Sequence, residues 1–142
     1  SFTDGSALRY FKLMLKNHKV DPETIESLCI NPTSILPQAQ YKTPLKMSKS
    51  GYIQSIDGMA IAKLGLRLKA GREKVGDIID PAVGIELCTQ VGQYLQENTT
   101  WAIIHHNTPI NPLWTEMQTD FLHITSQEPQ LSSRIISVLR KE

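Results

Sequence analysis

The sequence predicts an α+β fold in which a short helical segment precedes a larger part that mixes strands and helices. Three observations support this. Residues 7–15 place apolar side chains at helical spacing, three prolines interrupt residues 31–44, and short apolar runs bounded by turn residues follow from residue 45. We therefore expect a helical segment at residues 1–31, a connector at residues 32–44 and a further domain at residues 45–142.

Two helices are expected at the start of the chain. Asp4 is a suitable N-cap for the first, since its carboxylate can accept free N–H groups of the first turn. The second is predicted to begin at residues 21–23, where Asp21 caps the helix and Pro22 suits its first position, and to end near Cys29. The apolar stripe of the first helix comprises Ala7, Leu8, Phe11, Met14 and Leu15.

The second part is expected to hold several strands and two helices. Strands are predicted at residues 45–48, 52–56, 85–88 and 101–105, with a possible last one at 134–139. A helix is predicted from Asp57 to a stop at Ala70-Gly71. One apolar row on this helix comprises Ile56, Ala60, Leu64 and Leu68, with Met59 and Leu66 beside the row. A last helix is marked by Leu113, Trp114, Met117, Phe121 and Ile124.

Composition and charge exclude several classes of protein. The 142 residues are 40% apolar and 20% charged, with a formal net charge of +1, which argues against disorder and against a globally basic surface for nucleic acid. No apolar run approaches the ~20 residues that span a bilayer. Cys29 and Cys88 are too few for a disulfide framework; they could form one bridge, but we expect a reduced, intracellular pair. We expect a cytoplasmic protein without membrane or nucleic-acid partners.

Residues 46–50, Lys-Met-Ser-Lys-Ser, match the lysine-rich loop of class I aminoacyl-tRNA synthetases. In those enzymes the loop acts with a paired-histidine motif on a nucleotide-binding parallel sheet. Here His105-His106 is not that motif and follows the loop instead of preceding it, and no doubly wound pattern is present. We interpret residues 46–50 as a polar strand end and turn.

The paired histidines and Cys88 do not predict a metal site or a nucleophile. His105 and His106 are adjacent on a predicted strand, so their side chains point to opposite faces and do not suit one metal ion. Cys88 has no neighbouring base in the sequence and is expected to be an inert packing residue. These side chains therefore predict neither a metal site nor a cysteine nucleophile.

A glycine-containing loop covers residues 71–84. Its glycines and cations suggest a phosphate cradle, but it lacks the Gly-Lys-Ser/Thr ending of a P-loop and carries two aspartates, so a structural turn is the better interpretation. We expect Arg72 to pair with one aspartate, and we expect positive φ or close backbone approach at two of the glycines, 76 and 84. The residues of this structural signature loop are Gly71, Arg72, Gly76, Asp77, Asp80 and Gly84.

Several segments, in the same order along the chain, resemble the C-terminal domain of the thymidine phosphorylase and pyrimidine-nucleoside phosphorylase family. The segments are 50–57 (Ser-Gly-Tyr-Ile-Gln-Ser-Ile-Asp), 68–72 (Leu-Lys-Ala-Gly-Arg) and 75–85 (Val-Gly-Asp-Ile-Ile-Asp-Pro-Ala-Val-Gly-Ile), followed by Ile104-His105. Residues 4–8 resemble the helix that leads into this domain. The resemblance covers nearly the whole chain and is weakest after Thr108.

The resemblance implies an α/β-hammerhead fold, related to barrel-sandwich domains, for residues 45–142, and it assigns residues 1–31 to the end of a parent α/β domain. The family reaction is phosphorolysis of thymidine or a related nucleoside to the base and a (deoxy)ribose 1-phosphate. The family's catalytic and substrate-binding motifs lie in the N-terminal two-thirds and have no counterpart here, so the resemblance assigns no catalytic or substrate-binding residue to this chain. We also expect no metal-ligating residue and no cofactor. The resemblance therefore implies a structural part that is inactive alone, whose partner is the N-terminal portion of the same enzyme, with a homodimeric parent.

Two alternatives use the same residues. A lipoyl or biotinyl carrier needs a modifiable lysine at a hairpin tip, for which Lys46 is the candidate. An anion-binding regulatory module would use residues 71–84.

Overall fold

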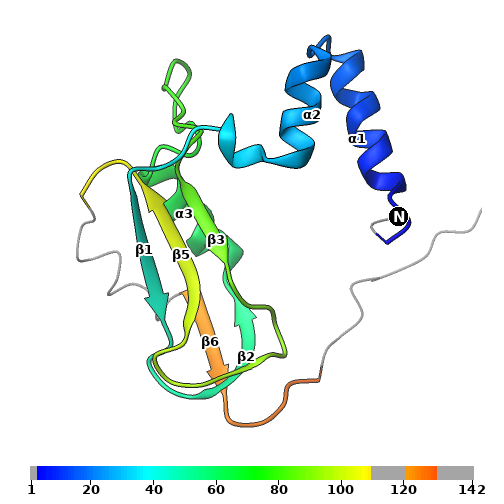
Figure 1. Ribbon diagram of the computed structural model, residues 1–142. Coiled ribbons are helices and arrows are strands. Elements are labelled where there is room, and N and C mark those ends of the chain that lie inside the picture. Colours follow the sequence, from blue (N-terminus) through cyan, green and yellow to red (C-terminus); the bar gives the residue numbers. More distant parts are fainter. Residues whose placement is uncertain (1–2, 110–120, 131–142) are drawn as a thin grey trace, which may run out of the picture. The chain divides into compact units, whose positions relative to one another are not determined.

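The computed structural model describes residues 3–109 and 121–130 (Figure 1). The chain divides into two compact units, Ser1–Gln38 and Ala39–Glu142. Within the described residues there are three α-helices and two three-stranded antiparallel sheets, so the architecture is mixed α+β, as the sequence predicts. None of the helices in this part of the chain combines the length and the apolar character needed to cross a membrane.

The first unit is a helical hairpin of α1 (Ser6–Asn17) and α2 (Pro22–Ile30), followed by a short 3-10 helix, η1 (Pro32–Ser34). The predicted start of α2 is confirmed, because an Asp21 carboxylate oxygen accepts the Thr24 N–H at 2.9 Å and Pro22 follows. The start of α1 differs from the prediction. Gly5, at φ 73°, is the N-cap, and Asp4 accepts the Ser6 N–H from one residue further out.

The apolar stripe of α1 is helical but largely open in the described chain. Leu8, Phe11 and Met14 are 49%, 40% and 47% exposed, and α1 contains no buried residue. A large apolar side chain contributes ~1.5–3 kcal/mol when it is buried. This helix therefore carries apolar surface whose burial its own unit does not provide.

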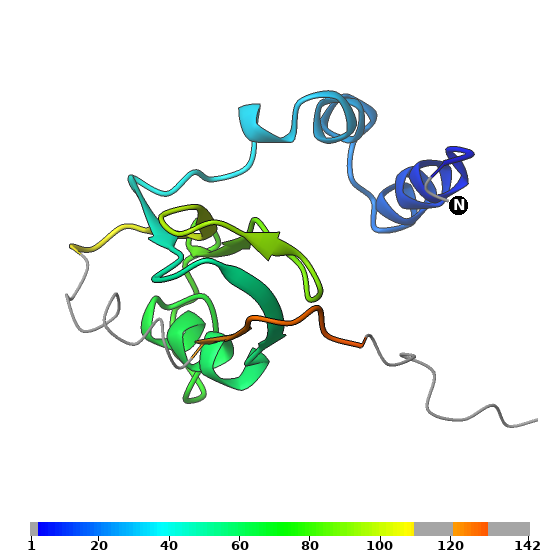
Figure 2. The ribbon, with the colours of Figure 1, turned by 90° about the horizontal axis from the view of Figure 1, so that it is seen from below.

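The second unit holds both sheets. In one sheet the order is β1 (Tyr41–Lys46), β5 (Thr100–His106), β3 (Gly84–Leu87). In the other it is β4 (Tyr94–Leu95), β2 (Gly51–Ile56), β6 (Leu122–Thr125). In the first sheet Ile104 lies opposite Thr43 on one side and Ile85 on the other. In Figure 2 these strands curve around a common interior.

Several predicted boundaries need correction. β1 covers residues 41–46 rather than 45–48, so part of the predicted connector is strand. Pro44 is accommodated because β1 is an edge strand, whose outer side has no ladder partner. Ile124 lies in β6 and not in a last helix. Residues 113, 114 and 117 of that helix, and the predicted strand at 134–139, lie outside the described residues, and the two-residue β4 was not predicted.

Helix α3 (Gly58–Arg67) starts as predicted and ends earlier. The Asp57 side chain accepts the N–H groups of Met59 and Ala60. At the other end Lys69 takes the left-handed conformation, with φ 70°, and the Ala70 N–H bonds back to the Gly65 carbonyl at 2.9 Å. The helix is therefore closed before the predicted stop at 70–71.

The core of the second unit joins both sheets and α3. Trp101 and Phe121 are each 1% exposed, and they are the largest side chains of the cluster. From the predicted row of α3, Leu64 and Leu68 are buried and Ala60 packs against the cluster, whereas Met59, beside that row, is 67% exposed. The buried cluster consists of Leu45, Met47, Ile53, Leu64, Leu68, Leu95, Trp101, Ala102, Ile104, Phe121 and Leu122.

Candidate functional site

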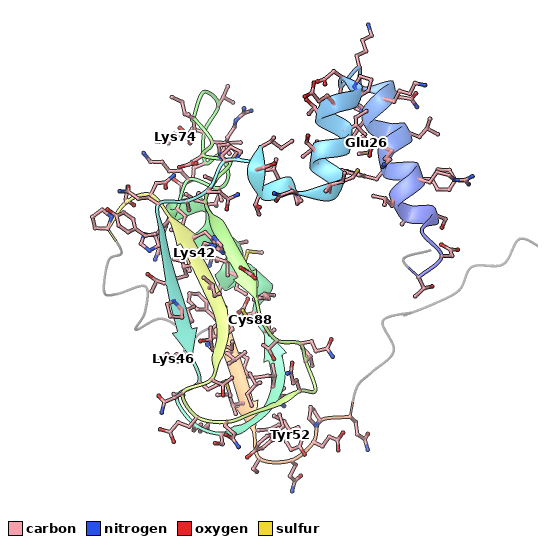
Figure 3. All side chains as sticks on the ribbon, viewed as in Figure 1. Glu26, Lys42, Lys46, Tyr52, Lys74 and Cys88 are labelled. Atoms are coloured by element: carbon pink, nitrogen blue, oxygen red, sulfur yellow. The ribbon has the colours of Figure 1, made fainter. Side chains whose placement is uncertain are left out.

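The signature loop joins α3 to β3 and projects from the second unit, with Lys74 labelled on it in Figure 3. Two aliphatic side chains of the loop are open to solvent, Val75 fully and Ile78 at 86% exposure. Gly71 lies close to α3, where an added Cβ would meet Leu66 Cδ2 at 2.9 Å. Gly76 has φ +97°, so it needs the left-handed region that glycine tolerates best, as predicted.

The Asp77 carboxylate binds the start of its own loop. One carboxylate oxygen, Oδ2, accepts the N–H groups of Glu73 at 3.0 Å and of Lys74 at 2.9 Å. These are the backbone donors that an anion in a phosphate cradle would use. Because an internal carboxylate already occupies them, this arrangement favours a structural turn over a cradle.

Asp80 is held by groups from two other segments. Its Oδ1 accepts the Ala82 N–H at 3.0 Å, its Oδ2 accepts the Asn107 side-chain amide at 2.7 Å, and its own N–H donates to the Lys69 carbonyl at 2.9 Å. The hydrogen bonds from Ala82 and then Asn107 hold the pKa of this carboxyl below its ordinary value of 3.8.

Asn107 was not predicted as a site residue. Its side-chain oxygen also accepts the Gln40 N–H at 2.7 Å, so this amide ties the end of β5 to the loop and to the chain just before β1. The sequence gives little signal for it: Asn107 follows a predicted strand as an ordinary polar turn residue, and Asp80 lies 27 positions away.

Two expectations for the loop are wrong. Within the described chain, Arg72 is exposed and forms no ion pair with Asp77 or Asp80, because both aspartates are bound by backbone N–H groups and, for Asp80, by an amide. Gly84 has neither a positive φ nor a close neighbour, since an added Cβ there would meet nothing within 4 Å. It begins β3 as an ordinary strand residue.

A groove of about 970 Å³ lies where the loop meets the end of α3. Arg67 and Lys69 line it together with Asp77, Ile79 and Asp80. Both signs of charge are present, and its two aspartates already have hydrogen-bond donors. The groove therefore has no excess of free cations directed at a phosphate.

The paired histidines point to opposite faces of the sheet, as expected. His105 Nε2 lies 3.0 Å from Glu86 Oε2 on β3. His106 is 4% exposed, stacks on Tyr41, and its ring nitrogens contact Thr43 Oγ1 at 2.9 Å and the Thr108 carbonyl at 2.6 Å. Among the described residues no group of three or more His, Cys, Asp or Glu side chains is placed to hold a metal ion.

Residues 46–50 form a strand end and a bend. Lys46 lies opposite Thr100 in the ladder, Met47 is buried, and Ser50 Oγ accepts the Glu97 N–H at 2.9 Å. β1 and β2 belong to different sheets, so Lys46 is not at the tip of a hairpin, which a carrier lysine requires.

The two thiols are free. Cys88 is exposed at the end of β3, so the expectation that it is a buried packing residue is wrong. Its N–H donates to the Trp101 carbonyl at 2.8 Å, which fixes the backbone and leaves the side chain outside.

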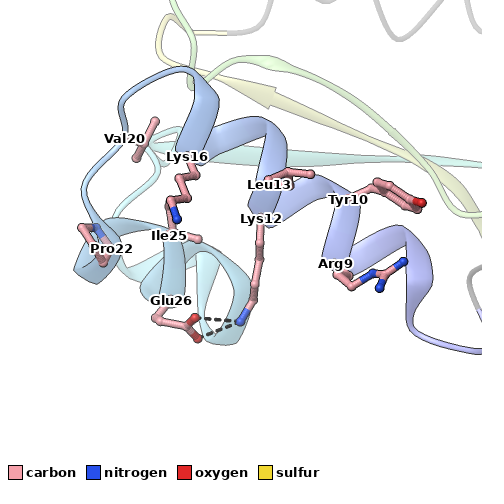
Figure 4. A pocket seen from close by; sticks show the side chains of 9 residues that line it. All are labelled: Arg9, Tyr10, Lys12, Leu13, Lys16, Val20, Pro22, Ile25 and Glu26. Atoms are coloured by element: carbon pink, nitrogen blue, oxygen red, sulfur yellow. Dashed lines mark hydrogen bonds and ion pairs between the residues drawn. The ribbon is translucent and has the colours of Figure 1, made fainter.

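The first unit has a groove of its own, of about 700 Å³, between α1 and α2 (Figure 4). Leu13, Val20 and Ile25 contribute apolar side chains to it. At its rim the Lys12 ammonium lies 2.8 Å and 2.9 Å from the two Glu26 carboxylate oxygens, and this hydrogen bonding raises the lysine pKa. Both side chains are substantially exposed, so solvent screens this pair and it adds little to the stability of the hairpin.

Comparison with known proteins identifies the fold family. The sequence model of the family called pyrimidine nucleoside phosphorylase C-terminal domain matches residues 52–124. These residues run from β2 into β6 and include the signature loop. Thymidine phosphorylase of Rattus norvegicus is 37% identical over 110 residues, 75% of this chain and 23% of that protein. Pyrimidine-nucleoside phosphorylase of Staphylococcus epidermidis is 36% identical over 104 residues, 73% of this chain and 23% of that protein.

Thymidine phosphorylase of Homo sapiens is 33% identical over 110 residues. The second unit is a small α+β domain whose core joins both sheets and α3. The chain belongs to the pyrimidine nucleoside phosphorylase C-terminal domain family. It spans 23% of the length of the curated relatives described above.

Proposed function

We propose that this chain is the C-terminal structural part of a thymidine phosphorylase-like enzyme, a pentosyltransferase of pyrimidine nucleoside salvage. In the parent reaction, phosphate attacks C1′ of thymidine or a related nucleoside and releases the base and a (deoxy)ribose 1-phosphate. The observation that carries the proposal is the family match over residues 52–124, whose ends fall in the paired strands β2 and β6 of one sheet.

The second unit would then be an α/β-hammerhead domain, and α1 and α2 would complete the parent α/β domain. The signature loop serves as a structural turn in this proposal. Its support is that Asp77 and Asp80 are both engaged by donors of the same unit. The parent enzyme is a cytoplasmic homodimer in this proposal, and phosphate and nucleoside bind its other portion.

The chain alone is expected to have no phosphorolytic activity. General acid–base work and charge stabilisation need groups that are positioned and available. Among the described candidates, His106 has both ring nitrogens in hydrogen bonds, to Thr43 and to the Thr108 carbonyl. The loop aspartates are engaged by backbone N–H groups of the loop and, for Asp80, also by the Asn107 amide.

The test is complementation. The purified chain is incubated with thymidine and phosphate while thymine release is followed, first alone and then mixed with rat thymidine phosphorylase that lacks the region this chain matches. We expect turnover only in the mixture. A variant with a disrupted core, Ile104→Asp, is the matched control and should not complement. Turnover by the repurified chain alone, or a mixture that stays inactive, would contradict the proposal.

A further inference from the structure

We propose that the groove between α1 and α2 is a docking site for an apolar segment flanked by carboxylates, supplied by the catalytic portion of the phosphorylase. This inference rests on the proposed function and adds to it the place and the chemistry of the contact. The residues that line the groove are drawn in Figure 4.

The floor of the groove is apolar. Ile25 of α2 is 6% exposed and already packed, whereas Leu13 of α1 is 50% exposed beside it. Val20, in the turn between the helices, adds a further aliphatic group. A volume of about 700 Å³ accommodates several side chains of an entering segment. Burial of this surface would add the stabilisation that the hairpin lacks by itself.

The rim of the groove carries uncompensated positive charge. Helix α1 contains Arg9, Lys12 and Lys16 and no acidic residue. The acid that faces them, Glu26, is engaged by Lys12 through both carboxylate oxygens.

Two cations at the rim therefore have no acidic partner among the described residues. Within the described chain, Arg9 lies over the Tyr10 ring at 5.1 Å and Lys16 is exposed, and neither forms an ion pair. Complementarity requires carboxylates on the occupant.

The shape and charge favour a protein segment of opposite charge over the other occupants. A lipid surface is met by the outward apolar face of an amphipathic helix, and it does not enter a concave space between two helices. A second copy related by two-fold symmetry would bring the same cationic rim against itself, which is repulsive. A different protein segment, with apolar side chains against the floor and carboxylates beside the cationic rim, complements both parts of the groove.

The experiment measures binding of the full chain to the rat thymidine phosphorylase portion used above, by calorimetry at low salt. Lys16→Glu is expected to weaken binding about tenfold, which is a typical scale for a complementary charge, and the loss should shrink at roughly 0.5 M salt. Lys19→Glu is the matched control: Lys19 is exposed, lies in the turn after α1 and does not line the groove. It should leave the affinity within about twofold of the parent chain.

Leu13→Asp tests the apolar floor and should weaken binding at least as much as Lys16→Glu. Circular dichroism of each variant checks that the helices persist. If Leu13→Asp unfolds the hairpin, the affinity of the Lys16→Glu variant alone tests the docking site. If the unmodified chain does not bind the portion at all, both the proposed function and this inference fail. If it binds and Lys16→Glu behaves like Lys19→Glu, the docking site is wrong while the proposed function stands.

Two further measurements test the rival occupants. Sedimentation of the chain alone should show no self-association that depends on Lys16. Self-association that Lys16→Glu abolishes would instead make a second copy of the chain the occupant of the groove. Vesicles of phosphatidylserine should show no binding that depends on Lys16, since that result would make the helical hairpin a lipid-binding element instead.

Discussion

Individual polar side chains determine the shape of the signature loop. Asp77 binds two backbone N–H groups at its start, and Asp80 is joined to Asn107 near its end. Asn107 in turn accepts the Gln40 N–H, so a single amide links three segments of the second unit. The effects of substitutions here are therefore expected to spread beyond the substituted residue.

Asn107→Ala should loosen both segments that the amide connects. It removes an acceptor from the Gln40 N–H and a donor from Asp80, so the Gln40 and Ala82 amides should exchange with solvent several-fold faster. Native-state hydrogen exchange measures this. Substitution of the exposed Gln54 by Ala on β2 is the control. Unchanged protection at Gln40 would show that water replaces the amide without loss.

Gly76→Val should destabilise the second unit by roughly 1–3 kcal/mol, because a β-branched residue is strained at φ +97°. Gly84→Val is the matched control, since this glycine starts β3 with no positive φ and open space around it. Urea denaturation of both variants gives the comparison. Equal effects of the two substitutions would mean that backbone strain at Gly76 is not the cause.

Helix α3 is the element on which the core and the loop both depend. Asp57 starts it by accepting two N–H groups, and the left-handed Lys69 closes it and directs the chain into the loop. Its two faces differ sharply: Leu64 is 3% exposed within the core, whereas Met59 is 67% exposed. The packing of one face therefore accounts for its place in the fold.

Leu64→Ala should lower the free energy of unfolding by about 2–5 kcal/mol, the range for a large apolar side chain removed from a core. Met59→Ala, in the same helix, should change it by less than about 0.5 kcal/mol. Chemical denaturation of both variants measures the two changes in the free energy of unfolding. Comparable losses would indicate that the exposed side of α3 is also covered in solution.

For the molecule as a whole, the lowered pKa values of two carboxyl groups in the second unit predict acid sensitivity. The N–H groups of Ala60 and Met59 lower the pKa of Asp57, and those of Ala82 and Asn107 lower that of Asp80. A carboxyl whose pKa is lower in the folded state stabilises the fold fully above its ordinary value of 3.8, and this contribution is lost as the pH falls through the folded-state pKa.

The free energy of unfolding should therefore decrease as the pH is lowered from about 5 towards 2. The double variant Asp57→Asn, Asp80→Asn should show a shallower decrease, because neither position titrates any longer. Thermal melts across this pH range, compared with the parent chain, provide the measurement. Parallel curves for the two proteins would exclude these carboxyl groups as the source.

Local patterns in the sequence determined much of this architecture. The caps at Asp21 and Asp57 and the strands that became β2, β3 and β5 depend on neighbouring residues, whose turn chemistry and apolar spacing are visible in the chain itself. The positive φ of Gly76 is equally local. The family could also be predicted, because ordered residues from 50 to 85 carry it.

Tertiary contacts decided the rest. Pro44 became part of a strand because β1 lies at a sheet edge beside β5, and Ile124 joined β6 because β2 offered it a ladder. Asp80 accepts a hydrogen bond from Asn107 and does not pair with the nearby Arg72, although Asn107 lies 27 positions away in the sequence. Sequence proximity indicates which charges are near, but only the folded chain determines which donors reach a carboxylate with good hydrogen-bond geometry.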